Sequence, residues 1–389
     1  MNEITVSSAA LPMQTHNFAW NVVDGLRKAN VDVSLLSALP IPNYPEYPRV
    51  FIRSVPIQER GVSGISLGFI NLLALKHVTR LLSCFTTGWK YIATVRPDVV
   101  VVHGVHSPFL LYARLLKRFA RMTICAILTD PPGIIRPRDG AFVRSLKWLD
   151  RKVVEKLCSG FDGVIALAPT LAKDLAAGVP VLVMEGIATQ ITLERTAPDR
   201  RHEVEGAFVL AYAGGLTAEY GVKNLVLAVE GLHQPGVRLD LYGRGPLEEW
   251  ILERASRDPR LHYHGAISRD ELLPRLARAD LLVNPRPVEQ EFVKYSFPSK
   301  LLEYMSLGVP VLSTRLPSIP VDYDRFLTYP KGDTPTSLME AITQIMDMSL
   351  VGRRRKADKA RQFVLREKGV SVQGKRMAEF LSALAKGQR

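Results

Sequence analysis

Residues 294–305 read Lys-Tyr-Ser-Phe-Pro-Ser-Lys-Leu-Leu-Glu-Tyr-Met, and residues 308–311 read Gly-Val-Pro-Val. Ser299 is placed to cap a helix that begins near Lys300, and the N–H groups at such a helix start favour an anion such as phosphate. Lys294 and Lys300 bring positive charge to the same place. Glu303 lies one turn into the helix, where its carboxylate can accept hydrogen bonds from two hydroxyl groups, as from a ribose. The alternative interpretation of Glu303 is a solvated surface charge.

Around this segment, short apolar runs alternate with helical patterns, which predicts a parallel sheet covered on both faces. The expected strands are Phe208–Ala213, Val237–Tyr242, Leu261–His264, Leu281–Val283 and Val309–Ser313. The expected helices are Val222–Leu232, Leu247–Ala255, Asp270–Ala279 and Ser299–Leu307, followed by a charged helical tail over Thr336–Met348 and Val351–Lys386.

The first half of the chain shows the same alternation and predicts a second doubly wound domain. Its expected strands are Ile4–Ser8, Val31–Ser37, Val99–His103, Met122–Leu128, Gly163–Ala168 and Val181–Met184. Its expected helices are Phe18–Lys28, Leu67–Thr94, Phe109–Phe119 and Phe142–Cys158.

A polar stretch, Ile187–Glu205, interrupts the alternation and is the expected linker between two domains. We therefore expect an α/β protein with Rossmann-like domains over residues 1–190 and 206–365, and a C-terminal helix over 366–389 that packs back on the first domain. Two such domains in series predict a central cleft, where ligands of α/β sheets usually bind.

Two glycine-containing junctions follow expected strands and are candidates for ligand contact. Gly214 and Gly215 let the backbone approach a ligand at the start of the next helix, although a plain strand-to-helix turn is an equal alternative. Gly243-Arg244-Gly245-Pro246 also fits a tight turn into a helix, with Pro246 near the first helical position. For this second junction the ordinary turn is the favoured interpretation.

Taken in order, these motifs resemble family 4 of the GT-B glycosyltransferases, and most closely the branch found in bacterial exopolysaccharide and capsule assembly. The motifs that carry the resemblance are Ala213-Gly214-Gly215-Leu216, Tyr220-Gly221-Val222, Gly243-Arg244-Gly245-Pro246, His264-Gly265-Ala266-Ile267, Asn284-Pro285-Arg286-Pro287, residues 297–305, residues 308–311 and Leu316-Pro317-Ser318-Ile319-Pro320. The resemblance spans the whole second domain and is looser in the first.

The resemblance implies a GT-B fold, in which two Rossmann-like domains face a central cleft. It implies a retaining transferase that takes a sugar from a nucleotide-diphosphate sugar held by the second domain, and that usually needs no metal or other cofactor. Glu303 would hold the donor ribose, the Gly214-Gly215 loop would lie along the diphosphate, and the backbone at Ala266 and Ile267 would meet the base. Helix N-termini and lysines would stabilise the departing diphosphate.

This chain departs from the family pattern at three positions. The earlier of two glutamates that the family spaces eight positions apart is Tyr295 here, the arginine of its Gly-Arg-Leu motif is Gly215, and its later lysine is Tyr220. Two phosphate-binding cations are therefore missing. We expect Lys300, together with Lys294 or Lys223, to replace them.

Candidate acceptor-side residues lie in the first domain. The family often has a histidine and an aspartate after a strand of this domain; Thr129 takes the place of the histidine, and Asp130 remains. His103 and His106 follow an earlier strand and are expected to face the cleft, where they and Asp130 are the catalytic candidates. His16 is expected on the first strand-to-helix loop. For each histidine a structural or solvated role is the alternative.

The chain of 389 residues carries a net charge of +13, which fits nucleic acid, anionic lipid or a phosphorylated small molecule as partner. No nucleic-acid module accompanies the charge. Basic residues cluster at Arg114, Lys117, Arg118 and Arg121, and again at Arg136, Arg138, Arg144, Lys147, Arg151 and Lys152, where Phe142 and Trp148 are interleaved. A basic helix with aromatics can lie on an anionic membrane, where lipid-linked acceptors are found. Solvated helices are the alternative.

Further features suggest a cytoplasmic protein, peripheral on the inner face of the plasma membrane. Cys84, Cys125 and Cys158 form neither a disulfide pattern nor a zinc site, and Cys125 is expected in the core. No signal peptide is visible, and Leu67–Ile92 is too polar to span a bilayer. Asp322-Tyr323-Asp324 matches the aspartate-x-aspartate pattern of some metal sites, but it follows a loop, and no metal is expected.

Three other functions are compatible with two such domains. A nucleotide-sugar epimerase would form product from the donor alone. A non-catalytic partner in glycan assembly gains support from the missing cations and the missing glutamate. An oxidoreductase that uses a dinucleotide is disfavoured, because Gly214-Gly215 lacks the Gly-x-Gly-x-x-Gly fingerprint.

Overall fold

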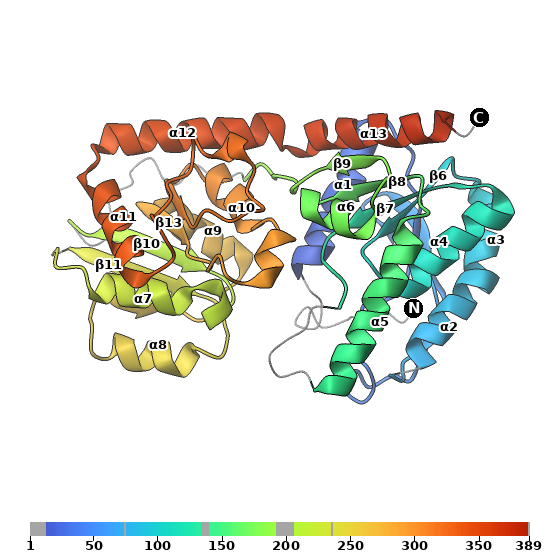
Figure 1. Ribbon diagram of the computed structural model, residues 1–389, viewed down its shortest axis with the longest axis horizontal. Helices are drawn as coiled ribbons and strands as arrows, with labels where there is room; N and C mark the ends of the chain where they lie inside the picture. The colour runs from blue at the N-terminus through green and yellow to red at the C-terminus, as the bar shows by residue number, and fades with distance from the viewer. Residues whose placement is uncertain (1–12, 74, 134–139, 192–205, 235, 388–389) are drawn as a thin grey trace. The chain divides into compact units, whose positions relative to one another are not determined.

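The computed structural model describes residues 13–73, 75–133, 140–191, 206–234 and 236–387, and it divides into two compact units. Unit 1 comprises Met1–Ile187 and Val370–Arg389, and unit 2 comprises Ala188–Gly369. The expected strand Ile4–Ser8, most of the expected linker, and Arg136 and Arg138 lie outside the described residues. Each unit is an α/β fold built on a parallel sheet (Figure 1).

Unit 1 is centred on a parallel sheet whose strands follow one another in chain order. The strands are β6 (Val99–His103), β7 (Thr123–Leu128), β8 (Gly163–Ala166) and β9 (Val181–Val183). Every residue of β7 and β8 is buried, as expected for strands covered on both faces. Cys125 is fully buried in β7, which confirms its expected place in the core.

Helices cover both faces of this sheet. The crossovers are α4 (Ser107–Ala120), α5 (Ala141–Cys158) and α6 (Pro169–Leu175), and right-handed connections in a sheet of this order place all of them on one face. The other face packs against α1 (Met13–Lys28) and α13 (Val370–Lys386). These two helices cross closely, because Gly374 has no side chain: a Cβ there would lie 2.0 Å from the Gly25 carbonyl oxygen.

The region before the β6–β9 sheet differs from the sequence prediction. The expected strand Val31–Ser37 is reduced to β1 (Leu35–Ser37), which runs parallel to β4 (Val62–Ser66); β4 in turn pairs antiparallel with β3 (Val55–Glu59). A further antiparallel pair, β2 (Phe51–Ile52) and β5 (Phe69–Ile70), was not predicted.

The expected helix Leu67–Thr94 begins later and is interrupted. It consists of α2 (Leu75–Ser83), a π-helical turn η2 (Cys84–Gly88) and α3 (Trp89–Val95). The fully buried Asn71 explains the late start, because its side-chain amide donates to the carbonyl oxygens of Pro42 (3.0 Å) and Arg49 (3.2 Å). These bonds hold the chain before α2 against an earlier loop.

Unit 2 matches the predicted order of strands and helices. Its parallel sheet has the order β12-β11-β10-β13-β14, formed by β10 (Phe208–Ala213), β11 (Val237–Tyr242), β12 (Leu261–Tyr263), β13 (Leu281–Asn284) and β14 (Val311–Ser313). One face is covered by α7 (Val222–Glu230), α8 (Glu248–Ala255) and α11 (Pro335–Asp347). The other is covered by α9 (Arg269–Arg278), α10 (Lys300–Ser306) and α12 (Leu350–Glu367). Short 3-10 turns are η3 (Ala218–Tyr220), η4 (Glu291–Lys294) and η5 (Val321–Tyr323).

The helical tail is broken rather than continuous. The α12 helix ends at Glu367, where the buried Lys368 accepts a hydrogen bond from Ala188 N through its carbonyl oxygen (2.7 Å), and α13 starts at Val370. The α13 helix therefore belongs to unit 1, whereas α12 packs in unit 2.

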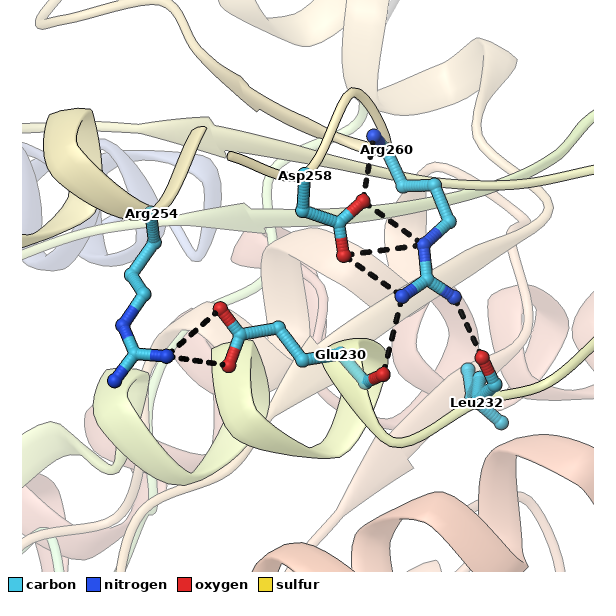
Figure 2. A network of polar contacts seen from close by, with 5 residues as sticks. All are labelled: Glu230, Leu232, Arg254, Asp258 and Arg260. Carbon is cyan, nitrogen blue, oxygen red and sulfur yellow. Dashed lines mark hydrogen bonds and ion pairs between the residues drawn. The ribbon is translucent and has the colours of Figure 1, made fainter. Parts of the chain in front are cut away.

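A polar network links the residues just before β12 to the end of α7 (Figure 2). The Arg260 guanidinium donates to the carbonyl oxygens of Leu232 (2.6 Å) and Glu230 (3.1 Å) and pairs with Asp258 (2.7 Å). Arg254 pairs with the Glu230 carboxylate at 3.1 Å. This network satisfies carbonyls at the end of α7 and is structural, since β12 begins here and its carboxyl end lies at the opposite edge of the sheet.

Candidate active site

The candidate site of unit 2 lies at the carboxyl ends of its strands. The sheet order reverses at β10: β11 and β12 follow on one side, and β13 and β14 on the other. Loops that leave neighbouring strands in opposite directions open a crevice, which is where α/β sheets bind ligands. The residues after β10, β11, β12 and β13 are therefore the relevant ones.

Gly214 and Gly243 bring the loops after β10 and β11 into direct contact. Gly214 N donates to the Tyr242 carbonyl oxygen at 2.9 Å. Gly243 has φ +134°, and a Cβ there would lie 1.8 Å from the Gly214 carbonyl oxygen. Gly243 is therefore required by this close approach of the two loops.

Lys300 and Tyr304 tie α10 to the end of β10. The Lys300 ammonium donates to the Ala213 carbonyl oxygen, and Ala213 N donates to the Tyr304 hydroxyl at 3.0 Å. A Cβ on Gly214 would lie 2.7 Å from Lys300 Nζ, so the lysine reaches directly over the Gly214 backbone. Lys300 therefore lies beside Gly214 at the end of β10, and the part played by the buried Tyr304 was not foreseen.

Burial is the main influence on the charge of Lys300. Loss of solvent lowers the pKa of Lys300 to about 8, the carboxylate of Glu303 raises it, and the positive charge of Arg286 lowers it further. Burial disfavours the charged form of a lysine, whereas a bound anion would favour it.

Glu303 lies on the first turn of α10 with a partner already in place. Its carboxylate pairs with Arg269 at 2.8 Å, and its side chain is 25% exposed. Arg269 is the first residue of α9. The pair links the start of α9 to the start of α10 and holds the Glu303 oxygens at the rim of the site.

Ser299 does not cap α10, which corrects the sequence prediction. Ser299 itself has helical backbone angles (φ −52°, ψ −26°), and its side chain makes no capping hydrogen bond. The turn starts one residue earlier, because Leu301 N donates to the Pro298 carbonyl oxygen at 2.8 Å. The Ser299 side chain is exposed, and α10 is only seven residues long.

The structure places the two other predicted lysines differently from Lys300. Lys223 is exposed on α7, where its ammonium lies 5.8 Å from the centre of the Trp250 ring. Lys294 is exposed at the end of η4.

Ala266 and Ile267 form the loop between β12 and α9. The loop is anchored at both ends, since Gly243 N donates to the Gly265 carbonyl oxygen at 2.8 Å and Ser268 caps α9 through Glu271 N at 3.3 Å. Ala266 is exposed and Ile267 half-buried. Their backbone groups thus lie beside Gly243 at the same edge of the sheet.

Sequence reasoning missed Arg286, which follows β13. Its guanidinium lies 4.8 Å from the centre of the Tyr220 ring and 5.2 Å from that of Phe292. Nε and Nη1 of Arg286 are buried without a hydrogen-bond partner in the described part of the chain. The motif Asn284-Pro285-Arg286-Pro287 was visible in the sequence, but nothing in its spacing placed it beside Tyr220.

The candidate residues of unit 1 lie at the carboxyl ends of β6 and β7. His103 is the last residue of β6; its ring packs against Phe18 with centroids 5.7 Å apart, and its Nε2 is buried with no hydrogen-bond partner among the described residues. Burial, followed by the charge of His106, lowers the pKa of His103. Desolvation by the surrounding protein and the charges of Arg80 and His77 lower the pKa of His106. Both shifts favour the neutral form of the ring.

Thr129 and Asp130 follow β7, with Asp130 exposed and Thr129 half-buried. The next turn is fixed by Gly133, which has φ +67°; a Cβ there would lie 2.4 Å from the Lys147 carbonyl oxygen of α5. His16 lies within α1 rather than on a loop, because that helix already begins at Met13. Its ring meets Trp20 edge-on at 6.4 Å.

Part of the basic excess has structural partners. Lys117 pairs with Asp162 at 2.5 Å, and Arg114 donates to the Gly160 carbonyl oxygen. On α5, Arg151 and Lys152 both pair with Glu155, at 3.1 and 2.7 Å. These four basic side chains therefore have partners within the protein.

Asp322-Tyr323-Asp324 forms η5 and the residue after it, and Asp324 is held by Arg315 (3.2 Å) and the Tyr329 hydroxyl (3.0 Å). Among the residues that the structure describes, no cluster of His, Cys, Asp or Glu side chains is arranged to hold a metal ion. No described helix is both long and apolar enough to cross a bilayer.

Two models of known families match the chain, one in each unit. Residues 207–348 match "Glycosyl transferases group 1", and residues 15–188 match "Glycosyltransferase Family 4". Both models describe sugar transfer, and together they cover most of the described chain. The chain is a glycosyltransferase.

Solved structures support the GT-B fold of the enzyme. Sucrose-phosphate synthase from Thermosynechococcus elongatus superposes with a TM-score of 0.70 at 15% identity, covering 95% of this chain and 93% of that one. Anabaena HepE in complex with UDP gives a TM-score of 0.58 at 17% identity, covering 83% of this chain and 87% of that one. A Listeria monocytogenes protein assigned as a UDP-N-acetylglucosamine 2-epimerase gives 0.52 at 13% identity, covering 84% of each. A search of curated proteins found no match.

Proposed function

We propose that this glycosyltransferase moves a sugar, with retention of anomeric configuration, from a nucleotide-diphosphate sugar to a lipid-linked glycan acceptor in bacterial polysaccharide synthesis. The observation that carries the donor side is the convergence of Lys300, Glu303 and the Gly214 backbone at the carboxyl edge of one sheet. Anabaena HepE, which shares the fold, binds UDP and UDP-glucose, so UDP-sugars are the first donors to test.

The proposed roles follow from the chemistry of each group. Glu303 would accept hydrogen bonds from the donor ribose in exchange for its bond to Arg269, and Ala266 and Ile267 would contact the base. The Gly214-Gly215 backbone and Lys300 would stabilise the diphosphate as the glycosidic bond breaks and negative charge gathers on the leaving group. No step in this scheme uses a metal or another cofactor.

On the acceptor side, we propose His103, His106 and Asp130 as the catalytic candidates, with Thr129 and His16 contributing to acceptor binding. The pKa of His103 is lowered by burial, and its Nε2 has no hydrogen-bond partner among the described residues, which suits a group that hydrogen-bonds a hydroxyl. His106 and Asp130 leave neighbouring strands at the same edge of the sheet.

A membrane-facing role for unit 1 is supported by an apolar stripe on α5. Phe142, Leu146, Leu149 and Val153 recur at helical spacing and are 81%, 58%, 53% and 42% exposed. Exposed apolar side chains that share a helix with Arg144 and Lys147 suit the interface of an anionic membrane, where a lipid-linked acceptor would be presented. We therefore propose a cytoplasmic enzyme that is peripheral on the inner face of the plasma membrane.

The membrane proposal is tested by sedimentation with vesicles of phosphatidylglycerol and, as reference, phosphatidylcholine. The double variant Phe142→Asp/Leu146→Asp should lose most of its binding to phosphatidylglycerol vesicles, because it places charge in the apolar stripe. The matched control is Leu350→Asp/Val351→Asp in unit 2, whose side chains are 47% and 76% exposed and which should bind as the wild type does. The proposal would be contradicted if both double variants lost vesicle binding equally, or if the wild type did not bind the vesicles at all.

Two alternatives remain distinguishable by the reaction products. An epimerase, a function assigned to one protein of similar fold, would convert the nucleotide sugar without an acceptor. A non-catalytic partner would bind a nucleotide sugar without turnover. The proposed transferase should release nucleoside diphosphate in proportion to glycosylated acceptor, and NMR of the product should show the anomeric configuration of the donor. Product from donor alone would replace this proposal by the epimerase.

A further inference from the structure

Arg286 has two buried guanidinium nitrogens, and among the described residues no carboxylate is among the groups that act on its charge. Its Nε and Nη1 have no hydrogen-bond partner in the described part of the chain, although a guanidinium has five N–H donors. Burial lowers the pKa of Arg286 from its ordinary value. A buried cationic group without hydrogen-bond partners lowers the stability of a protein. Such a group therefore calls for an explanation, and a bound ligand that supplies the missing hydrogen-bond partners is one.

Two aromatic rings and a backbone hydrogen bond hold Arg286 in place. Its guanidinium stacks on Tyr220 and lies near Phe292, and these two rings meet edge-on with centroids 6.1 Å apart. Thr314 donates its hydroxyl hydrogen bond to the Arg286 carbonyl oxygen. Gly221 has φ +74°, and a Cβ there would lie 1.8 Å from the Pro285 carbonyl oxygen, so the loops after β10 and β13 pack backbone against backbone.

Arg286 and Lys300 are two cations that both lie near Tyr212. The Lys300 ammonium lies 5.9 Å from the centre of the Tyr212 ring, and Arg286 is close enough to lower the pKa of Lys300. The nearby carboxylate is that of Glu303, which already pairs with Arg269. Among the described residues, the acidic group that acts on Lys300 is Glu303, and no carboxylate is among the groups that act on Arg286. Two neighbouring cations of this kind suit an anion with more than one charge, and a planar guanidinium suits phosphate oxygens.

We propose that Arg286, together with Lys300, binds the diphosphate of the nucleotide-sugar donor. Tyr220 and Phe292 then serve to hold the guanidinium in place, and Gly221 and Thr314 fix its loop. The inference rests on the proposed function for the identity of the ligand, while the anion site itself rests on the geometry of Arg286. The same cations would stabilise the diphosphate as it leaves the sugar.

The test compares Arg286→Met and Arg286→Lys with wild type by isothermal titration of UDP, UMP and inorganic pyrophosphate. Arg286→Met should weaken UDP and pyrophosphate about 10- to 100-fold and UMP by less, because charge-assisted hydrogen bonds to the diphosphate are lost. Arg286→Lys should recover part of the affinity. The control is Arg353→Met, since Arg353 also stacks on an aromatic ring of unit 2, 4.9 Å from the centre of Phe208, but at the start of β10; it should bind as wild type does.

Thermal unfolding of the same proteins without ligand separates binding from structure. Arg286→Met should unfold at the same temperature as wild type or higher, because it removes an unpaired buried charge. Affinity for UDP and pyrophosphate within threefold of wild type in Arg286→Met would overturn the inference. A lower unfolding temperature that Arg286→Lys restores without restoring affinity would also overturn it, because Arg286 would then be structural.

The two proposals fail in different ways. Wild-type binding of pyrophosphate that depends on Arg286, without binding of UDP or another nucleoside diphosphate, would support the anion site and contradict the donor assignment. Wild-type binding of UDP that does not depend on Arg286 would leave the donor assignment standing and contradict this inference. Absence of binding of all three probes to wild type would contradict both.

Discussion

At the scale of single residues, Lys300 connects burial to pH dependence. Burial lowers its pKa to about 8, so its ammonium is mostly charged at pH 7 and mostly neutral at pH 9. Because only the charged form attracts a diphosphate, binding of UDP or the UDP-sugar should weaken above pH 8, approaching about tenfold per pH unit. Isothermal titration between about pH 7 and pH 9.5 measures this slope.

Substitutions at Lys300 provide the controls for that slope. Lys300→Arg keeps its charge throughout this range and should bind with little dependence on pH, because an arginine does not lose its proton there. Lys300→Met should bind weakly at pH 7 and show no slope. A wild-type affinity that stays constant from pH 7 to pH 9.5, or the same slope in Lys300→Met, would show that another group titrates.

The residues of the donor site were predictable to the extent that they lie close together in sequence. Lys300 and Glu303 share one motif and one helix, and in the structure Lys300 lies beside Gly214. The expected cap by Ser299 was wrong, because the turn begins at Pro298. Arg286 could not be predicted, since its place beside Tyr220 depends on β13 lying next to β10, a contact between strands far apart in sequence.

At the scale of elements, the strands of unit 2 were predictable because they are buried on both faces and therefore read as continuous apolar runs. The sheet of β10–β14 agrees with the expected ranges within about two residues. The strands β1–β5 are short, partly exposed and paired with distant segments, so their sequence carries no comparable pattern. The turn before α2 likewise depends on the tertiary hydrogen bonds of Asn71.

The network of Figure 2 predicts a loss of stability without a loss of binding. Arg260→Ala should lower the free energy of unfolding by about 1–3 kcal/mol, because it leaves the Leu232 and Glu230 carbonyls and the Asp258 carboxylate without their partner. Urea denaturation measures this change, and UDP affinity should stay that of wild type.

The matched control for Arg260 is Arg257→Ala. Arg257 pairs with Glu253 at 2.6 Å, but the two side chains are 69% and 55% exposed, and exposed ion pairs contribute little. Its variant should unfold within about 0.5 kcal/mol of wild type. If Arg260→Ala is no less stable than Arg257→Ala, the network does not stabilise the end of α7.

At the scale of the whole molecule, the chain enters unit 2 at Ala188 and returns to unit 1 at Val370. The polar composition of residues 187–205 indicated the first passage, but the helical pattern of the tail did not reveal the break after Glu367. That break depends on Lys368, whose carbonyl oxygen meets Ala188 N, and such a contact between distant residues leaves no periodic signal.

The most direct test of the account is a thermal-shift screen of the whole protein against nucleotide-diphosphate sugars, with Glu303→Ala beside the wild type. The account predicts that one donor raises the unfolding temperature of wild type, by an amount that corresponds to about 2.7 kcal/mol at 100 times its dissociation constant, and that Glu303→Ala loses this response. No shift with any donor, or an equal shift in Glu303→Ala, would contradict the assignment of the donor site to unit 2.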